Sequence, residues 1–333
     1  MDRAVTVVGA GILGLWQALT LARGGARVRL IEASSIPFAN AASRWAGAMI
    51  APDCEEEAAQ PIIRTLGHEG RALWRSVYPQ LVCRGSLVVA AARDRGELQR
   101  FARLTNGSEA VDAERLGALE PALAGRYQNG LYFADEAHME TPHALAFLLD
   151  AVRAAGAQVR LGETWQRGAT ADGTVIDCRG IAARAELPGL RGVRGERLLV
   201  RAPDLQLQRP VRLLHPRASF YVVPWRDGLH LIGATVIESE DTSAMTVRSG
   251  LELLGLAYAL HPAFGEAEIL ETSAGVRPAF ADNVPRAIVR GGVIHVNGAY
   301  RHGFLLAPVL AAAVADYLAT GKARSQVMAV ADA

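Results

Sequence analysis

Three glycines near the N-terminus have the spacing of a nucleotide-binding turn. The segment VVGAGILG places Gly9, Gly11 and Gly14 in a G-x-G-x-x-G pattern, and Glu32 follows 18 residues after the last of them. In such a turn the first glycine permits the tight bend, the second lets backbone N–H groups approach a pyrophosphate, and the third lets helix and strand pack closely. The acidic residue can accept hydrogen bonds from ribose hydroxyls. These residues therefore predict a dinucleotide site, against the alternative of an ordinary glycine-rich turn.

Two arginines in the last fifth of the chain could bind an anion. Arg277 in GVRPAF and Arg301 in GAYRHGFLLAP both stand among apolar residues. A charge in apolar surroundings costs several kcal/mol unless an anion meets it. A guanidinium pairs with a carboxylate through charge-assisted, often bidentate hydrogen bonds, worth about 1.5–3 kcal/mol. We therefore expect Arg277 to bind a carboxylate, with a salt bridge between two lobes of the protein as the alternative.

The glycine pattern alone does not separate FAD from NAD, because both cofactors use it. The chain holds no second G-x-G-x-x-G, and its three cysteines, Cys54, Cys83 and Cys178, form no CxxC pair. A second nucleotide site for a nicotinamide and a redox dithiol are therefore both missing. What remains is a plain NAD dehydrogenase or a flavoprotein that its substrate reduces directly. The cysteines also argue against a disulfide scaffold or zinc site and fit a reducing cytoplasm.

The bulk composition predicts a globular protein of two lobes. Half of the 333 residues are hydrophobic, and 35 basic against 34 acidic residues leave a formal charge of +1. Without a global field we expect neither nucleic acid nor an anionic membrane as a partner. The uncharged run 4–22 is long enough to span a bilayer, but its β-branched start and its glycines indicate strand, turn and helix. The apolar run 303–315 is expected to be too short to span.

The elements that must position these residues follow from periodicity and turn signals. A strand–helix–strand unit is predicted at 3–8, 12–23 and 26–32, followed by an irregular segment at 33–59. In that segment we expect CEEE at 54–57 to be no more than an acidic helix start. Further helices are predicted around 58–77, 141–155, 247–260 and 304–318. Further strands are predicted at 85–91, 129–136, 195–202, 209–215, 219–224, 228–235, 269–273, 286–290 and 292–298. Continuously apolar strands, typical of a buried parallel sheet, alternate along the chain with strands typical of hairpins. We therefore expect two lobes that are interleaved in the sequence.

Six separated segments together resemble the D-amino-acid oxidase family of FAD enzymes, and within it the glycine oxidases of thiamine biosynthesis. They are VTVVGAGILGLWQALTLA, AASRWAGAMIAPDCEEE, VIDCRGIAARAELPGLRGVRGE, SFYVVPWRDGLHLIGAT, SAGVRPAFADNVPRA and HVNGAYRHGFLLAP. The resemblance implies an α/β fold: an FAD-binding, Rossmann-like domain of the glutathione-reductase type, interleaved with an α+β substrate domain built on an antiparallel sheet. The implied FAD-binding parts are 1–80, 140–185 and 275–333, and the implied substrate-binding parts are 81–139 and 186–274.

The resemblance also implies roles for particular residues. Arg277 would bind the substrate carboxylate, Tyr221 would help to hold it, and Met49, Arg301 and His302 would lie beside the flavin and substrate. For Tyr221, core packing is an equal alternative. The cofactor would contact Gly9, Gly11, Gly14, Glu32, Ser43, Ala46, Gly47, Ala48, Met49, Gly180, Arg301, Gly303, Phe304 and Leu305.

Two positions depart from the family pattern. Ala48 stands where the family usually has glycine, and His302 stands where it commonly has asparagine. His302 could face the flavin or be a hydrogen-bonded residue behind it. Both departures concern substrate choice more than the fold.

The activity implied by the resemblance is oxidative deamination with non-covalent FAD. Glycine or a similar small amino acid would yield imine, then oxo acid and ammonia, with dioxygen reduced to hydrogen peroxide. A quinone-linked dehydrogenase, an oxidase of sarcosine or small D-amino acids, and a non-catalytic nucleotide-binding partner protein remain alternatives. We also expect a cytoplasmic homo-oligomer of two or four copies without a bound metal.

Overall fold

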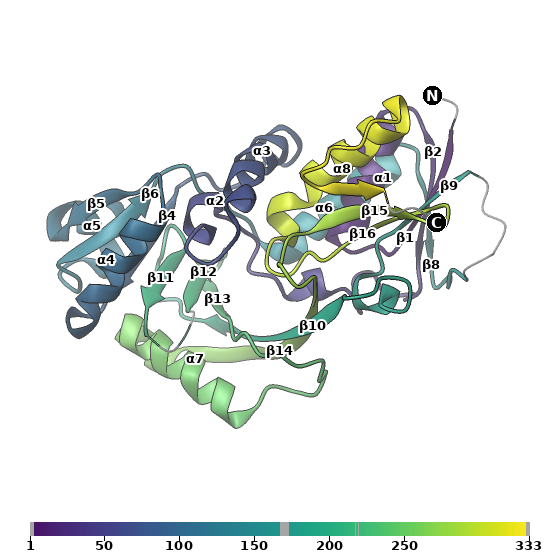
Figure 1. Cartoon of the computed structure of the whole chain (residues 1–333). Helices are drawn as coiled ribbons and strands as arrows, with labels where there is room; N and C mark the ends of the chain where they lie inside the picture. Colours follow the sequence, from purple (N-terminus) through teal and green to yellow (C-terminus); the bar gives the residue numbers. More distant parts are fainter. Residues whose placement is uncertain (1–2, 167–172, 217, 219, 331–333) are drawn as a thin grey trace.

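Two sheets organise the protein, and the chain passes between them several times (Figure 1). The computed structural model describes residues 3–166, 173–216, 218 and 220–330. The first sheet has seven strands in the order β17-β15-β16-β9-β1-β2-β8, and the second has eight in the order β14-β10-β13-β12-β11-β4-β6-β5. The prediction of interleaved lobes is therefore confirmed, whereas the exact domain boundaries stay a prediction.

The seven-stranded sheet carries the N-terminal strand–helix–strand unit at its centre. β1 pairs in parallel with β2 and β9, and β9 pairs in parallel with β16. β1 is almost completely buried, as expected for a parallel sheet covered by helices. Its strands are β1 (Ala4–Val8), β2 (Arg27–Glu32), β8 (Gln158–Leu161), β9 (Thr174–Asp177), β15 (Arg286–Arg290), β16 (Val293–Asn297) and β17 (Met328–Val330). The helices associated with it are α1 (Ile12–Arg23), α3 (Pro61–Val77), α6 (Thr141–Ala154) and α8 (Gly303–Thr320).

The helix α8 packs between α1 and α3. It has 18 residues and is long and apolar enough to cross a membrane, so the expectation of a run too short to span is wrong. More than half of it is buried inside the protein, which fits a core helix. Pro308 has no N–H to donate to the carbonyl of Phe304, four residues earlier, and the Trp74 indole donates to that oxygen instead at 2.6 Å.

Helix α3 touches α8 through backbone. A Cβ added to Gly70 would lie 2.0 Å from the carbonyl oxygen of Leu305, and one added to Gly67 would lie 3.0 Å from the Leu305 side chain. Only glycines allow α3 to come this close, because any side chain there would overlap α8. The first turn of α8 is thus located by direct contact with α3.

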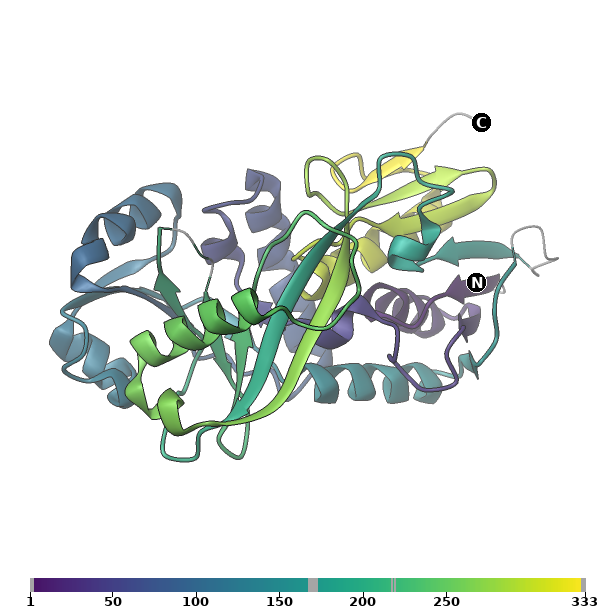
Figure 2. The ribbon, with the colours of Figure 1, turned by 90° about the horizontal axis from the view of Figure 1, so that it is seen from below.

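The eight-stranded sheet is mainly antiparallel, with one parallel pair between β4 and β11. Its two long strands, β10 and β14, run from the region of α7 toward the lobe that contains the seven-stranded sheet (Figure 2). The strands are β4 (Ser86–Ala90), β5 (Glu109–Asp112), β6 (Asn129–Phe133), β10 (Arg191–Arg201), β11 (Val211–Leu214), β12 (Tyr221–Pro224), β13 (Leu229–Gly233) and β14 (Glu268–Ala279). The helices α4 (Arg95–Leu104), α5 (Ala113–Leu119) and α7 (Val247–Leu260) belong to this lobe.

Short elements complete the described chain, and several were not predicted. They are α2 (Pro52–Glu55), β3 (Met49–Ile50), β7 (Ala137–His138) and the 3₁₀ turns η1 (Ala42–Trp45), η2 (Ala92–Asp94), η3 (Pro121–Leu123), η4 (Gly180–Ala183) and η5 (Pro262–Glu266). The helices α4 and α5 and the strands β5, β8, β9 and β17 were missed, and the strand predicted at 269–273 is β14, which is more than twice as long. Ser219, in one predicted strand, lies outside the described residues, as do 1–2 and 331–333 at the ends of the predicted domains.

Candidate active site

A cavity of about 580 Å³ lies between the two sheets. This volume is typical of a site for a small molecule or cofactor. All predicted site residues line it except Gly14: Gly9, Gly11, Glu32, Ser43, Ala46, Gly47, Ala48, Met49, Gly180, Tyr221, Arg277, Arg301, His302, Gly303, Phe304 and Leu305. Residues far apart in the sequence are thus brought to one place.

The glycine turn has the geometry that its spacing predicts. Gly9 has a φ of +95°, and a Cβ there would lie 2.8 Å from the Cys178 carbonyl oxygen. A Cβ on Gly14 would lie only 1.8 Å from the carbonyl oxygen of Gly9, so helix α1 presses directly on the turn. Gly14 therefore works from behind the cavity, where it keeps α1 close to β1.

The acidic residue of the fingerprint is fixed at the rim of the cavity. The Glu32 carboxylate accepts hydrogen bonds from the N–H groups of Ala10 at 2.8 Å and Ser34 at 3.0 Å. A carboxylate keeps further lone pairs when two are used, so Glu32 can still accept from ribose hydroxyls.

Two helices begin at the cavity without a capping side chain on the N-cap residue. Helix α1 follows Gly11 and α8 follows His302, and neither N-cap residue makes a side-chain cap hydrogen bond. Ser43 accepts from the N–H of Ile12 at 3.2 Å, which holds the strip 41–46 against the start of α1. Free N–H groups and the helix dipole make such ends suitable for anionic groups. A cavity with two such ends and an acidic ribose acceptor fits a dinucleotide such as FAD.

The strip from Ala46 to Met49 crosses the cavity between these two helix ends. The carbonyl of Ala46 accepts from the Thr141 hydroxyl at 2.6 Å, and the carbonyl of Ala48 accepts from the Met139 N–H at 3.2 Å. Ala48 is buried and has a φ of +50°, a conformation that favours glycine. The Ala48 methyl group therefore stands at the cavity wall, in a backbone conformation that glycine would adopt more easily.

Arg277 reaches the cavity from β14. Its Nη1 donates to the carbonyl oxygens of Arg194 at 3.4 Å and Thr235 at 3.2 Å. Its guanidinium lies over Gly195, where a Cβ would be 1.9 Å from Nη2. Within the described residues Arg277 makes no ion pair, so the interlobe salt bridge is wrong and the positive charge is available for a ligand. Burial lowers the pKa of Arg277 from its usual value.

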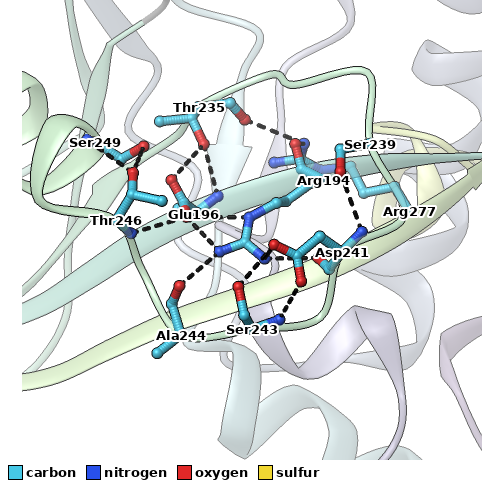
Figure 3. A network of polar contacts seen from close by, with 10 residues as sticks. All are labelled: Arg194, Glu196, Thr235, Ser239, Asp241, Ser243, Ala244, Thr246, Ser249 and Arg277. Atoms are coloured by element: carbon cyan, nitrogen blue, oxygen red, sulfur yellow. Dashed lines mark hydrogen bonds and ion pairs between the residues drawn. The ribbon is translucent and has the colours of Figure 1, made fainter.

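A buried ion pair on β10 is formed by the two residues that flank Gly195, and its side chains lie on the face of the strand opposite to Arg277 (Figure 3). The side chains of Arg194 and Glu196 are almost fully buried and meet at 2.5 Å. Arg194 also donates to the carbonyls of Asp241 at 2.6 Å and Ala244 at 2.8 Å. This pair binds the segment 234–246, which connects β13 to α7 and adds Ala234 and Val236 to the cavity wall.

Tyr221 lies flat over two glycines at the same wall. A Cβ on Gly233 would be 2.8 Å from the Tyr221 hydroxyl, and a Cβ on Gly47 would be 2.9 Å from its ring. The hydroxyl makes no hydrogen bond to the part of the chain that the structure describes, and the ring is only partly buried. This placement favours ligand contact over simple core packing.

The anion that meets Arg301 is Glu55, which sequence reasoning missed. Glu55 pairs with Nη2 of Arg301 at 3.3 Å and with Nη2 of Arg212 at 2.8 Å, and it lines the cavity. Burial alone would raise the pKa of Glu55, but Arg301 and Arg212 outweigh burial and hold it well below its usual range. The expectation that CEEE is only an acidic helix start is therefore wrong, because Glu55 ends α2 and carries a buried negative charge. The run of three glutamates beside a cysteine was the available signal.

His302 is buried beside this group. Its Nδ1 lies 3.6 Å from Oε2 of Glu55 and makes no hydrogen bond to the described residues. Burial lowers the pKa of His302 to about 4, so the ring is neutral at physiological pH. The alternative in which His302 is a hydrogen-bonded residue behind the cavity wall therefore lacks a hydrogen bond at Nδ1. His302 instead lines the cavity itself.

Comparisons with known proteins agree with this site. A family model described as DAO, FAD dependent oxidoreductase, matches residues 4–317. The chain belongs to this family of FAD-dependent oxidoreductases, so the predictions of the cofactor and of the fold are confirmed and a plain NAD dehydrogenase is wrong.

Within this family, the chain is similar to two curated relatives and to one solved structure. A Rhizobium etli protein, provisionally named thiamine biosynthesis oxidoreductase ThiO, is 49% identical over 317 residues, which are 95% of this chain and 96% of that protein. Glycine oxidase from Pseudomonas aeruginosa is 28% identical over 96% of this chain and 95% of its own. The crystal structure of glycine oxidase from Geobacillus kaustophilus has the same fold, with a TM-score of 0.80 and 24% identity over 97% of this chain and 96% of that one.

Proposed function

We propose that this protein oxidises glycine, or an amino acid of similar size, to an imine that water converts to an oxo acid and ammonia. The observation that carries the proposal is Arg277: a guanidinium free of any ion pair within the described residues, in the cavity of an FAD-dependent enzyme, beside the unbonded hydroxyl of Tyr221. The names of the Rhizobium etli and Pseudomonas aeruginosa relatives support the same substrate class.

The residues of this chain would hold the substrate by its carboxylate. Arg277 supplies a charge-assisted pair, and the Tyr221 hydroxyl can donate to the same carboxylate. Two fixed points on one carboxylate orient the substrate Cα, which lowers the entropic part of the barrier. Bound FAD supplies the chemistry by accepting a hydride equivalent from that carbon.

Another arginine of the cavity, Arg301, has a carboxylate partner. Glu55 pairs with Arg301 and with Arg212, so these three groups keep one net positive charge, whereas Arg277 has no carboxylate partner within the described residues and is better placed to attract the substrate carboxylate. The N–H groups at the start of α8 would stabilise negative charge that develops on the group they face. Arg277, which would bind the substrate carboxylate, is thus a different group from the N–H donors at the start of α8.

The decisive experiment is reduction of the purified, flavin-loaded protein without oxygen. Glycine, sarcosine and D-alanine are added in turn, and the loss of flavin absorbance is followed by stopped flow. We expect glycine to bleach the flavin, and Arg277→Leu to raise the concentration required for half the limiting rate by about 10–100-fold. A flavin that none of these amines reduces would remove the proposal and favour the non-catalytic alternative.

The electron acceptor requires its own measurement. We propose dioxygen, and one hydrogen peroxide formed for each oxo acid supports this choice. Turnover with a quinone but not with oxygen would instead make the protein a dehydrogenase.

Cellular role and assembly extend the proposal. The name of the Rhizobium etli relative supports a role in thiamine biosynthesis. We also propose a place in the cytoplasm, which the three free cysteines fit. Exposed apolar residues on α7, namely Val247, Leu251 and Tyr258, support a homo-oligomer of two or four copies. Light scattering of the protein and of Leu251→Glu tests this assembly, which a monomeric wild type would contradict.

A further inference from the structure

Arg277 is tethered by backbone oxygens, and this leaves its charge intact. Both of its hydrogen bonds to the described residues use Nη1 and end on main-chain carbonyls, those of Arg194 and Thr235. A carboxylate in their place would neutralise the guanidinium and weaken its attraction for a substrate anion. With Nη1 held by carbonyls, the edge formed by Nε and Nη2 remains for a ligand.

The two carbonyls belong to main chain that pairs along β10 at Arg194 and Glu196, and the side chains of these two residues add contacts to the same segment (Figure 3). Residues 235–237 run alongside β10: Ile237 exchanges backbone hydrogen bonds with Arg194 at 2.8 and 3.0 Å, and the N–H of Thr235 donates to the carbonyl of Glu196 at 3.2 Å. The Thr235 hydroxyl also accepts from the N–H of Glu196 at 2.9 Å and donates to its carboxylate at 3.5 Å. The tether for Arg277 is therefore part of the segment 234–246.

The far end of the segment is tied to the same pair. The Glu196 carboxylate accepts from the N–H of Thr246, the N-cap of α7, at 3.2 Å. The Arg194 guanidinium binds the carbonyls of Asp241 and Ala244, in the middle of the segment. Both ends and the middle of a thirteen-residue connection thus converge on one ion pair that water does not reach.

We propose that Arg194 and Glu196 are positioning residues for substrate binding: together they fix the segment 234–246 so that the Thr235 and Arg194 carbonyls aim the Arg277 guanidinium at the substrate carboxylate. The pair is neutral overall, so it sets the direction of Arg277 without cancelling its charge. This inference rests on the proposed role of Arg277 as the carboxylate anchor. It assigns to a buried ion pair a function in affinity for the substrate that extends beyond stability.

The test uses Glu196→Gln in the flavin-loaded enzyme and an equilibrium measurement. Acetate, a carboxylate that has no amine to oxidise, is titrated against the oxidised protein while the flavin spectrum is followed. We expect the dissociation constant for acetate to rise about tenfold, because a misaligned guanidinium loses one charge-assisted hydrogen bond. In anaerobic reduction, the limiting rate should fall far less than the affinity for glycine.

A comparison of ligands separates positioning from general damage. Glycinamide has the same size as glycine but no carboxylate, so its apparent affinity should be the same in Glu196→Gln and wild type. Equal losses for glycine and glycinamide, or an unchanged acetate constant, overturn the proposal. Glu268→Gln is the matched control, since Glu268 pairs with Arg201 between the same two strands but far along them and in solvent. It should leave the acetate constant unchanged.

A double-mutant cycle completes the test. If the pair acts through Arg277, adding Glu196→Gln to Arg277→Leu should weaken acetate binding no further. Additive losses would show that the pair acts elsewhere. Should Glu196→Gln fail to fold, Thr235→Val removes the hydroxyl that links the segment to Glu196 and gives the same readings. Absence of acetate binding by the wild type would contradict the proposed function itself, which keeps the two failures distinct.

Discussion

The two walls of the cavity present different chemistry to their ligands. The wall that belongs to the seven-stranded sheet offers mainly backbone: the glycine turn before α1 and the uncapped start of α8. The wall that belongs to the eight-stranded sheet offers side chains, Arg277 and Tyr221, which lie flat over Gly195 and Gly233. A backbone wall depends on the absence of side chains, whereas a side-chain wall depends on how each group is held.

This difference predicts unequal tolerance to substitution. At the FAD-binding wall one methyl group added to Gly9 or Gly14 meets main chain, which cannot change rotamer to make room. At the substrate wall an added or altered group shifts one side chain and changes affinity by degrees. Gly14→Ala and Gly195→Ala test this contrast directly, and Glu136→Gln and His302→Asn test buried titratable groups near the walls; they follow from the largest expected effect to the smallest.

Gly14→Ala should abolish FAD binding. The new Cβ would lie 1.8 Å from the Gly9 carbonyl oxygen, so α1 must separate from the turn that carries the pyrophosphate site. The flavin content of the purified protein, read from its absorbance, measures the effect. Gly96→Ala is the control, because nothing lies within 4 Å of a Cβ there. Normal flavin content in Gly14→Ala would break the contrast between the walls.

Gly195→Ala should spare FAD binding and damage substrate binding. Its Cβ would lie 1.9 Å from Nη2 of Arg277 and would displace the guanidinium. Loss of a charge-assisted pair predicts a rise of about 10–100-fold in the dissociation constant for acetate, measured by flavin difference spectroscopy. Gly255→Ala on α7, where a Cβ meets nothing within 4 Å, should behave as wild type. A Gly195→Ala protein that binds acetate normally would show that Arg277 is not the anchor.

Glu136→Gln should flatten the dependence of stability on pH. Glu136 accepts from the N–H of Cys54 at 2.7 Å, and burial raises its pKa from 4.5 to about 7. Since the folded protein holds this proton more tightly than the unfolded chain, the contribution is fully present below pH 4.5 and is lost as pH rises through 7. The loss amounts to about 3 kcal/mol at most, from 1.36 kcal/mol per pKa unit.

Denaturant melts of the wild type and Glu136→Gln between pH 5 and pH 8 measure this loss. We expect the wild type to lose stability over that range and the variant to lose less. The exposed neighbour Asp135, changed to Asn, serves as the control and should follow the wild type. Parallel curves for the wild type and Glu136→Gln would contradict the raised pKa.

His302→Asn should have the smallest effect. Burial lowers the pKa of His302 to about 4, so the imidazole is already neutral above pH 6 and asparagine replaces one neutral group with another. The profile of limiting reduction rate against pH between 6 and 9 should keep its shape. A transition in this range that disappears in the variant would show that His302 carries a proton there and acts in the reaction.

The sequence was sufficient to predict those parts of the protein whose defining residues are contiguous in the chain. The strand, glycine turn, helix and acidic residue at 3–32 form one continuous unit, so spacing alone identified it. The helices α1, α3, α6, α7 and α8 were also predicted close to their observed bounds. In contrast, α4 buries only Leu98 and Phe101, and so short an apolar pattern does not distinguish a helix from a loop.

The missed parts of the site depend on contacts between distant segments. Glu55 meets Arg212 and Arg301 across 157 and 246 residues of chain, and nothing local to the CEEE run reveals these partners. Arg194 and Glu196 stand two residues apart on one strand, yet the Arg194 guanidinium binds carbonyls 47 and 50 residues further on. A wall built from such side chains can be identified only when the three-dimensional arrangement of the strands is known.

The contact between α3 and α8 sets a mechanical tolerance for the cofactor site. Gly70 of α3 meets the Leu305 carbonyl without an intervening layer of side chains. A packed layer of leucines can absorb a shift by changing rotamers, but main chain against main chain transmits it undiminished. Helix α3 therefore sets how far the first turn of α8 reaches into the cavity, and a substitution that tilts α3 would move this turn with it.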